Sequence, residues 1–432
     1  MKRFKHIFRT ILAVLLINLT TETWAQDLPN GTTSDISAQD TRINQETYAW
    51  LDSIDISLLT CGPGQEVWSY YGHTALRIQD KAHGSDVAVN WGMFSFKQDY
   101  FILRFVFGMT DYQMGISPMS DFIAEYTSEG RWVRQQRLRL SPKEKLGILR
   151  AIEQNAQPEN RTYRYNFFYD NCTTRARDLL IYNMGADKTN FVNKETRSTY
   201  REEIHKWNKD HRWARFGNDL LLGYLADVPI NQQEWEFLPD NLSKDFATEA
   251  RTDTSKIAWN RNLPVKNNNY IALVDTTFYV VAPQAAIPES ELITPRMLFL
   301  CLAVVISMFC GLEVYRKKNF WWLDTTLLIL TGLPGLILMA MVFSQHPTVQ
   351  ANFQILILNP LNLIFVWSVT KKLRKGKTYW YYHIWGSMLI LALFLQIRQD
   401  YAEGMQILAL SLLVRYATRS IMLTSKDILS KK

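Results

Sequence analysis

The chain has 432 residues, of which 47% are hydrophobic, and its 48 Lys and Arg against 41 Asp and Glu give a formal net charge of +7. That length exceeds what one hydrophobic core usually organises, so we expect two or more structural units. Apolar residues concentrate from about residue 296 onward, and much of the basic excess lies in short loops between apolar segments. Basic residues in these loops indicate membrane topology and not nucleic-acid binding. We therefore expect no nucleic-acid partner.

The first 25 residues have the organisation of a secretory signal peptide. Four Lys and Arg residues precede a short apolar run, and a polar stretch then ends at Ala25. We expect cleavage after Ala25, with an uncleaved anchor as the alternative because the bulky Trp24 lies beside the cut. In either case the next part of the chain is exported. The expected organisation is a periplasmic domain over 26–225, a small β-containing segment and linker over 226–295, a transmembrane domain over 296–424, and a cytoplasmic tail over 425–432.

The exported part alternates strand and helix signals, which predicts an α+β fold. Apolar runs at 74–78 and 86–90, separated by a polar stretch, predict a β-hairpin, and the alternation at 131–140 predicts another strand. Ser141, Pro142 and Glu144 are the residues of a capped helix start, so a helix should run to about residue 155. An extended segment at 163–169 is followed by a short amphipathic helix from Cys172 to about residue 184. Strand-like stretches at 270–274 and 278–282 predict a smaller β element before the membrane.

Five apolar segments follow, each close to the length needed to span a bilayer: 297–314, 321–343, 353–369, 379–395 and 405 to about 423. Clusters of Lys and Arg come after the first, third and fifth segments, whereas the other two loops carry few cations. Positive loops face the cytoplasm, so the polar domain should lie in the periplasm and the protein in the bacterial inner membrane. Arg415, inside the fifth segment, is expected to snorkel toward the cytoplasm, with an internal polar site as the alternative.

Cys172 is the first candidate nucleophile. It lies in the first turn of its predicted helix, after Asn171 and one turn before Arg175, where the helix dipole and the guanidinium should lower the thiol pKa. The alternative is a Cys61–Cys172 disulfide, since the periplasm is oxidising. The other two cysteines lie within the first apolar segment and are expected to be ordinary helix residues.

A thiolate needs a proton acceptor, and His73 is the best candidate among the few histidines of the exported domain. It lies at the edge of a predicted strand, directly after Tyr71 and Gly72, where an imidazole can project into a cleft. A third residue usually orients such an imidazole. Asn90 on the neighbouring strand is our choice, with Asp99 and Asp170 as alternatives.

Three further features suggest lipid contact. Aromatic residues are dense at 94–107; composition alone favours a buried core strand or helix, and the alternative is that they line an acyl groove. His346 lies in an uncharged periplasmic loop, where it would assist Cys172, contact a headgroup or cap the loop. Asn359, Pro360 and Asn362 in the third segment predict helix packing or a polar lipid site.

The order of His, a polar residue and then Asn-Cys opening a helix resembles the circularly permuted papain-like superfamily. More closely, Gly-His-Thr-Ala-Leu-Arg at 72–77, Asn-Trp-Gly at 90–92, Asp-Asn-Cys-Thr-Thr-Arg at 170–175 and Asp-Leu-Leu-Leu-Gly at 219–223 resemble the exported domain of the lipoprotein N-acyltransferase family Lnb. Ser-Gln-His-Pro at 344–347 and Asn-Pro-Leu at 359–361 resemble its membrane part. The resemblance implies a circularly permuted papain-like exported domain followed by an all-α five-helix transmembrane domain.

The resemblance also implies a reaction that needs no cofactor and no metal. Cys172 would take an acyl chain from a membrane phospholipid as a thioester and pass it to the α-amino group of a diacylglyceryl-cysteine lipoprotein. His73 would be the base and Asn90 its partner. The positions expected to bind substrate or support the site are Asn171, Arg175, Tyr71, His346 and Asn359. The alternatives are a membrane-tethered cysteine peptidase or peptidoglycan amidase with the same Cys-His pair, and a non-catalytic scaffold with the disulfide formed.

Overall fold

The computed structural model describes residues 45–94, 99–184, 195–248, 250–252, 270–284 and 292–429. The chain divides into two compact units, Met1–Tyr48 and Ala49–Lys432. The predicted signal peptide lies outside the described residues. Helix α2 (Gln45–Ser53) leads into the first strand of the second unit, where the Trp50 indole donates a hydrogen bond to Asp80 over 2.8 Å.

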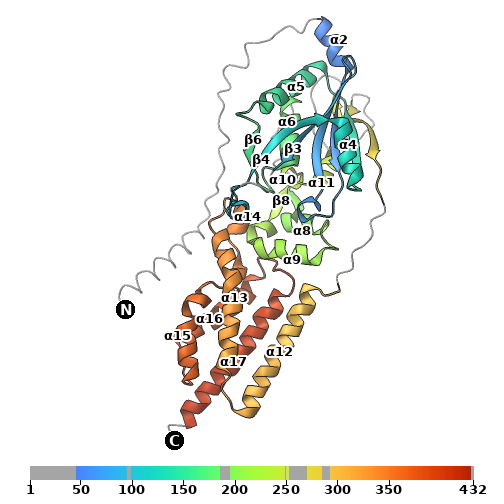
Figure 1. The fold of residues 1–432 in the computed structure, drawn as a ribbon. Coiled ribbons are helices and arrows are strands. Elements are labelled where there is room, and N and C mark those ends of the chain that lie inside the picture. The colour runs from blue at the N-terminus through green and yellow to red at the C-terminus, as the bar shows by residue number, and fades with distance from the viewer. Residues whose placement is uncertain are drawn as a thin grey trace. The chain divides into compact units, whose positions relative to one another are not determined.

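An antiparallel seven-stranded sheet organises the region before the membrane helices (Figure 1). Its strand order is β11-β5-β1-β2-β3-β4-β6. The strands are β1 (Ile54–Cys61), β2 (His73–Asp80), β3 (Ser85–Met93), β4 (Asp111–Pro118), β5 (Val133–Leu138), β6 (Thr162–Arg164) and β11 (Val274–Val281). Two-stranded sheets add β7 (Glu195–Thr199) with β8 (Pro229–Asn231) and β9 (Ala250–Thr252) with β10 (Tyr270–Ala272).

Helices cover both faces of this sheet. Thr74 of β2 lies 3.0 Å from Thr173, oxygen to oxygen, whereas its neighbour Ala75 is buried in the cluster that contains Phe122. Because successive side chains of a strand point to opposite faces, α6 (Cys172–Asn183) and α4 (Met119–Ser128) pack on opposite sides. The other helices here are α3 (Phe101–Val106), α5 (Pro142–Ala156), α8 (Tyr200–His205), α9 (Arg212–Leu221), α10 (Gln232–Trp235) and α11 (Pro239–Thr248), with 3-10 turns η1 (Val67–Ser69) and η2 (Tyr224–Asp227).

Local sequence signals account for several of these elements. The predicted hairpin is β2 and β3, paired from Ala75 and Asn90 to Asp80 and Ser85. The predicted capped helix is α5, in which Ser141 and Glu144 form a reciprocal capping box. The extended stretch predicted at 163–169 is only partly a strand, because β6 ends at Arg164.

The segment 226–295, where we expected a smaller β element, contributes a strand to the main sheet. Strand β11 pairs with β5 and is an edge of the main sheet. Helix α11 contacts β1 and α6, and Gln136 of β5 both donates to the Ser243 carbonyl and accepts from the Ser243 hydroxyl. The β5 edge of the sheet is therefore paired with a strand that comes late in the chain, just before the membrane helices.

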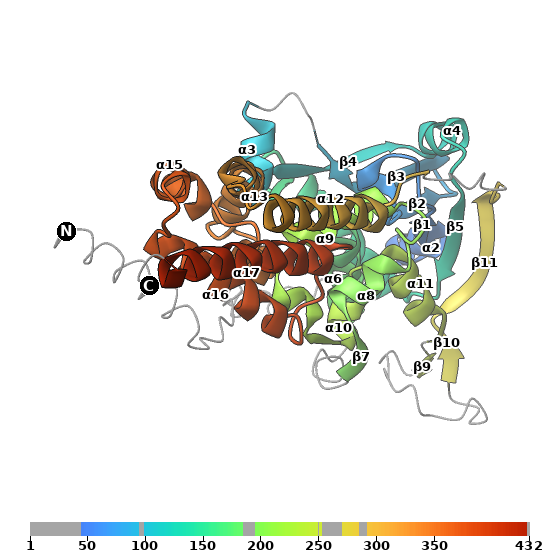
Figure 2. The same ribbon diagram turned by 90° about the horizontal axis from the view of Figure 1, so that it is seen from below.

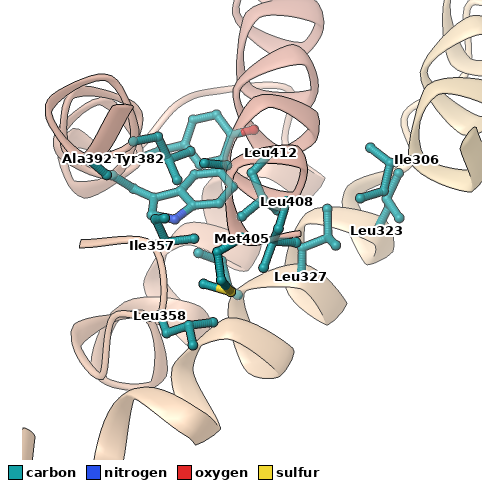
Figure 3. Close-up of a cluster of buried hydrophobic side chains, with 14 of the residues drawn as sticks. Ile306, Leu323, Leu327, Ile357, Leu358, Tyr382, Ala392, Met405, Leu408 and Leu412 are labelled. Carbon is teal, nitrogen blue, oxygen red and sulfur yellow. The ribbon is translucent and has the colours of Figure 1, made fainter. Parts of the chain in front are cut away.

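The C-terminal region is a bundle of apolar helices, confirming an α+β domain followed by a helical membrane domain (Figures 1 and 2). Its elements are α12 (Pro295–Arg316), α13 (Trp321–Met341), α14 (Pro347–Gln350), η3 (Phe353–Leu356), α15 (Leu361–Arg374), α16 (Trp380–Leu395) and α17 (Met405–Leu429). Four stretches within the described residues have the length and apolar composition to cross a membrane, and α16 is a shorter apolar helix. Buried Leu, Ile and aromatic side chains from all these spans form one cluster (Figure 3).

The third predicted segment is interrupted, not continuous. Its helical pieces η3 and α15 are separated by a break at Asn359 and Pro360, where the Asn359 side chain accepts a hydrogen bond from the Leu361 N–H over 2.9 Å. Asn362 donates to Thr331 and accepts from Tyr381, which joins three helices. Both amides thus serve the start of α15 and helix packing, as one of our two interpretations required.

Arg415 does not snorkel, and our expectation was wrong. Its side chain is fully buried and forms an ionic cluster with Glu313, Asp324 and Arg419. Arg415 Nη2 lies 2.6 Å from Asp324, and Arg419 Nη1 lies 2.8 Å from Glu313. Two cations facing two carboxylates inside the bundle remove the need to reach water.

Candidate functional site

Cys172 is the first residue of α6, and the chain ahead of it is shaped to start a helix there. The Asn171 side-chain oxygen accepts hydrogen bonds from the N–H groups of Thr173 and Thr174, and the Thr174 hydroxyl accepts from the Asn171 N–H. The Asn171 amide group also donates to the carbonyls of Phe167 and Phe237. Asn171 therefore holds the helix start rigidly, and the half-buried Cys172 side chain lies beside the open end of the dipole.

His73 begins β2, and the preceding glycine determines how the chain reaches it. Gly72 has a φ of +77°, and a Cβ at this position would lie 2.5 Å from the Cys61 carbonyl oxygen. Only glycine combines that backbone conformation with so close an approach. The turn sets His73 opposite Cys61 in the β1–β2 register.

The structure brings Cys172, His73 and Asn90 together. His73 Nε2 lies 2.7 Å from Asn90 Oδ1, and the Gly92 N–H donates to the same oxygen over 2.7 Å. Because the amide oxygen accepts from Gly92, its natural role toward His73 is also acceptance, which leaves Nδ1 of the imidazole for the hydrogen bond with Cys172. A Cβ at Gly92 would lie 2.6 Å from the His73 ring, so the bare backbone of this glycine forms one wall of the site.

Charge and hydrogen bonding favour a thiolate at Cys172. Burial opposes its ionisation, but the charge on His73 and hydrogen bonds from His73, the Thr74 N–H and the Thr173 hydroxyl outweigh burial and lower the pKa of Cys172 to about 7. Burial alone would lower the pKa of His73, whereas the opposing charge of Cys172 raises it. The two groups therefore stabilise each other as a thiolate and an imidazolium.

Arg175 has a different task from the one expected. It forms a bidentate pair with Asp170, at 2.6 and 2.8 Å, and its guanidinium lies 3.7 Å above the Tyr163 ring centre. The charge on His73 is the largest of the influences that lower the pKa of Cys172. Asp170 is engaged by Arg175, so it is Asn90 that contacts His73.

The other expected site residues, Tyr71, His346 and Asn359, have contacts of their own. The Tyr71 hydroxyl accepts hydrogen bonds from Asn208 and Asn218. His346 is buried, packs on Phe167 with 4.6 Å between ring centres, and has neither ring nitrogen hydrogen-bonded within the described part of the chain. Burial lowers the pKa of His346 to about 4, so this imidazole is neutral. Asn359 lies in the bundle, where its amide group contacts Met388.

The remaining histidines near the sheet have other partners. His83 pairs with Asp80, His205 with Asp219, and His211 stacks on Tyr70. The choice of His73 from its position on a strand edge thus agrees with where the structure places it.

Cys61 and Cys172 are both free thiols, so the disulfide alternative does not hold in this structure. Burial raises the pKa of Cys61 to about 12, which keeps it protonated and unreactive at neutral pH. Two thiols near one another therefore have opposite chemical character.

Two contributors to the site were not foreseen as such: Gly92, which packs on His73, and Thr173, which supports the thiolate. Both lie next to residues that the motifs already single out, and Gly92 is part of the Asn-Trp-Gly stretch. A glycine two residues after the His partner was the available signal, but the backbone approach that gives it meaning is visible only in three dimensions.

Two models of known protein families match the chain. One family model, the Lnb N-terminal periplasmic domain, matches residues 41–202, and another, the Lnb transmembrane domain, matches residues 287–427. Comparisons with curated proteins and with solved structures gave no match. The two matched regions contain, respectively, the Cys172–His73–Asn90 site and the helical bundle. The chain therefore belongs to the Lnb family and is an inner-membrane protein with a periplasmic N-terminal domain.

Proposed function

We propose that this protein is a lipoprotein N-acyltransferase that works through a thioester on Cys172. The observation that carries the proposal is a thiolate-forming cysteine at a helix start, paired with His73, in the periplasmic domain of a membrane-anchored Lnb chain. A Cys–His pair of this kind is suited to acyl transfer, and the membrane anchor keeps the pair close to lipid substrates. The donor is a membrane phospholipid and the acceptor a diacylated lipoprotein.

In the first half-reaction, the Cys172 sulfur attacks an ester carbonyl carbon of the phospholipid. The carbonyl oxygen becomes an oxyanion, and the Cys172 N–H is its natural donor because the Asn171 side chain already occupies the N–H groups of Thr173 and Thr174. As the carbon–oxygen bond to the lyso-lipid breaks, the His73 imidazolium gives its proton to the departing oxygen. The acyl group remains on Cys172 as a thioester.

In the second half-reaction, the neutral α-amino group of the lipoprotein attacks the thioester. His73, now neutral, accepts a proton from the attacking nitrogen, and the carbon–sulfur bond breaks to restore the thiolate. The amide product carries the acyl chain, and the imidazolium–thiolate pair is regenerated. Asn90 holds the imidazole in the orientation that both proton transfers need.

The test is replacement of Cys172 by Ala in a strain that lacks any other enzyme of this activity, followed by mass spectrometry of lipoprotein N-termini. Loss of the N-linked acyl chain is expected, together with loss of the acyl adduct on the purified protein. Unchanged N-acylation would remove the proposed function. Release of cell-wall fragments by the wild-type protein, without acyl transfer, would point to the amidase instead.

A further inference from the structure

A helix next to the membrane domain exposes apolar side chains where a folded domain would normally bury them. Tyr100, just before α3, is 79% exposed, and Ile102, Leu103 and Phe105 of α3 are 76%, 56% and 42% exposed. The described aromatic residues of this stretch are therefore not a buried core, contrary to the interpretation that composition favoured. Phe96 lies outside the described residues. Contiguous apolar exposure of this kind marks a surface that meets lipid or another partner.

The position of α3 identifies lipid as what it meets. The Phe107 carbonyl, directly after α3, accepts a hydrogen bond from the Gln345 N–H over 2.9 Å, and Gln345 lies four residues beyond the end of α13. Helix α3 contacts α13 and lies beside it in Figure 2. Since the loop charges put the end of α13 on the periplasmic side of a candidate span, we expect α3 at the level of the outer leaflet.

Charges around α3 fit the same surface. Arg104 of α3 and Arg164 of β6 both bind Asp111, at 2.5 and 2.8 Å, so this group of three has one positive charge in excess. Arg164 also donates to the Gln345 side chain over 3.4 Å. A basic group beside exposed aromatic side chains is the usual composition of a protein surface among lipid headgroups.

A continuous row of aromatic rings leads away from α3. Ring centres are separated by 6.5 Å between Phe105 and Phe101, 6.3 Å between Phe101 and Phe94, 4.7 Å between Phe94 and Tyr112, and 4.0 Å between Tyr112 and Tyr165. We call these five residues the aromatic track. Its members are half-buried or exposed residues.

The far end of the track lies near the nucleophile, seven residues before Cys172 in the chain. Directly after Tyr165, Asn166 and Asp170 exchange two backbone hydrogen bonds of 2.9 Å. The chain therefore turns back here, and Asp170 lies beside Asn166. Cys172 follows two residues later. Burial raises the pKa of Tyr112 and Tyr165, and the charge on Cys172 raises each further, which agrees with their closeness to the thiol.

We infer that the aromatic track holds the acyl chain of the donor phospholipid, with its ester at Cys172 and its tail directed along the rings to α3 and the outer leaflet. The inference rests on the proposed function and specifies its donor site. Flat rings at these spacings offer an apolar surface to a flexible chain without a fixed length, because contact with each ring contributes separately. After cleavage the tail stays on the track while the lyso-lipid leaves, so the thioester waits for the lipoprotein amine.

The experiment measures the acyl adduct on Cys172 of the full-length protein by intact mass spectrometry, with two donors. One donor is palmitoyl-oleoyl phosphatidylethanolamine in mixed micelles, and the other is p-nitrophenyl acetate, whose acyl chain is too short to use the track. In Phe101→Ser/Phe105→Ser we expect acylation by the phospholipid to slow about tenfold and acylation by the acetate to stay within about twofold. The matched control is Phe278→Ser, an exposed aromatic residue of β11 that should change neither rate.

Equal phospholipid rates in the double variant and in the control would overturn the inference. If the double variant slows both donors, Phe101→Leu/Phe105→Leu decides, because it keeps apolar surface and must retain most of the phospholipid rate. Failure of the Leu variant to do so would also overturn the track. A wild-type protein that forms no adduct with phospholipid would instead remove the proposed function, a result visible before any track variant is made.

Discussion

Two groups of opposite charges in this molecule have different properties: the Cys172–His73 pair is suited to chemistry, and the ionic cluster of the bundle is suited to structure. The cluster is fully buried and richly bonded, since Asp324 also accepts from the Tyr382 hydroxyl and Glu313 from the Phe320 N–H. The Cys172–His73 pair is half-buried, and its two groups act on each other: the pKa of Cys172 is lowered to about 7 and the pKa of His73 is raised. A fully buried network holds its charges in place, whereas a pair with an open side and pKa values shifted toward one another can do chemistry.

Removing one charge from the cluster should have the largest effect. Arg415→Met leaves Glu313 and Asp324 with one guanidinium between them in a buried setting, so we expect the free energy of unfolding to fall by about 3–5 kcal/mol. Thermal unfolding of the purified protein in detergent measures it. Arg398→Met, at an exposed loop position, is the control and should change stability by no more than about 0.5 kcal/mol. Equal melting temperatures for the two variants would show that the cluster contributes little.

Removing the partner of the thiolate should instead affect chemistry with little effect on folding. In His73→Gln we expect acyl transfer to slow by about 10²–10³-fold, because the acid–base group is lost. Wild-type alkylation by iodoacetamide should rise with pH through about 7 as the Cys172 thiolate forms. Without the imidazolium, burial is left as the main influence and raises the pKa, so the rise should move to clearly higher pH. His83→Gln is the control, and a profile unchanged in His73→Gln would contradict the pairing.

The sequence predicted the arrangement of the Cys172–His73 pair better than that of the ionic cluster. Cys172, His73 and Asn90 were predictable because a capped helix start, a strand edge and a neighbouring strand are local patterns that place side chains with few alternatives. The apolar segments of the bundle were predictable from local composition, although α16 is shorter than the four stretches that are long enough to cross a membrane. Arg415 was misjudged because its partners lie about a hundred residues away on α12 and α13. Arg175 was misjudged because Asp170, five residues earlier, competes for it.

The edge of the sheet shows the same limit. Strand-like stretches at 270–274 and 278–282 were expected from their composition, but the pairing of β11 with β5 was not. Antiparallel pairing with β5 depends on a return of the chain after more than a hundred residues. The aromatic stretch is a third case. Composition alone cannot distinguish a core from a lipid-facing surface, and the difference here comes from the hydrogen bond that attaches Phe107 to the loop after α13.

The orienting role of Asn90 should give a moderate effect. Asn90→Ala removes the acceptor of His73 Nε2 and of the Gly92 N–H, so we expect kcat for acyl transfer to fall on the order of tenfold with KM little changed. Asn90→Asp keeps an oxygen at the same position and should recover most of the loss. A rise in KM alone, or no rescue by Asp, would show that Asn90 acts on binding or packing and not on the imidazole.

The smallest effect is expected at Cys61, which separates reactivity from mere proximity. Its thiol lies opposite His73 in the strand register, but burial raises its pKa to about 12, so at pH 7.5 it is almost entirely protonated. Cys61→Ala should keep acyl transfer within about twofold and cost roughly 1 kcal/mol of stability for the lost buried sulfur. Peptide mapping after brief alkylation of the wild type should find label at Cys172 and not at Cys61. Equal labelling of both, or a Cys61–Cys172 disulfide in the isolated protein, would mean that burial does not protect Cys61 and that the contrast between the two thiols is not a property of this fold.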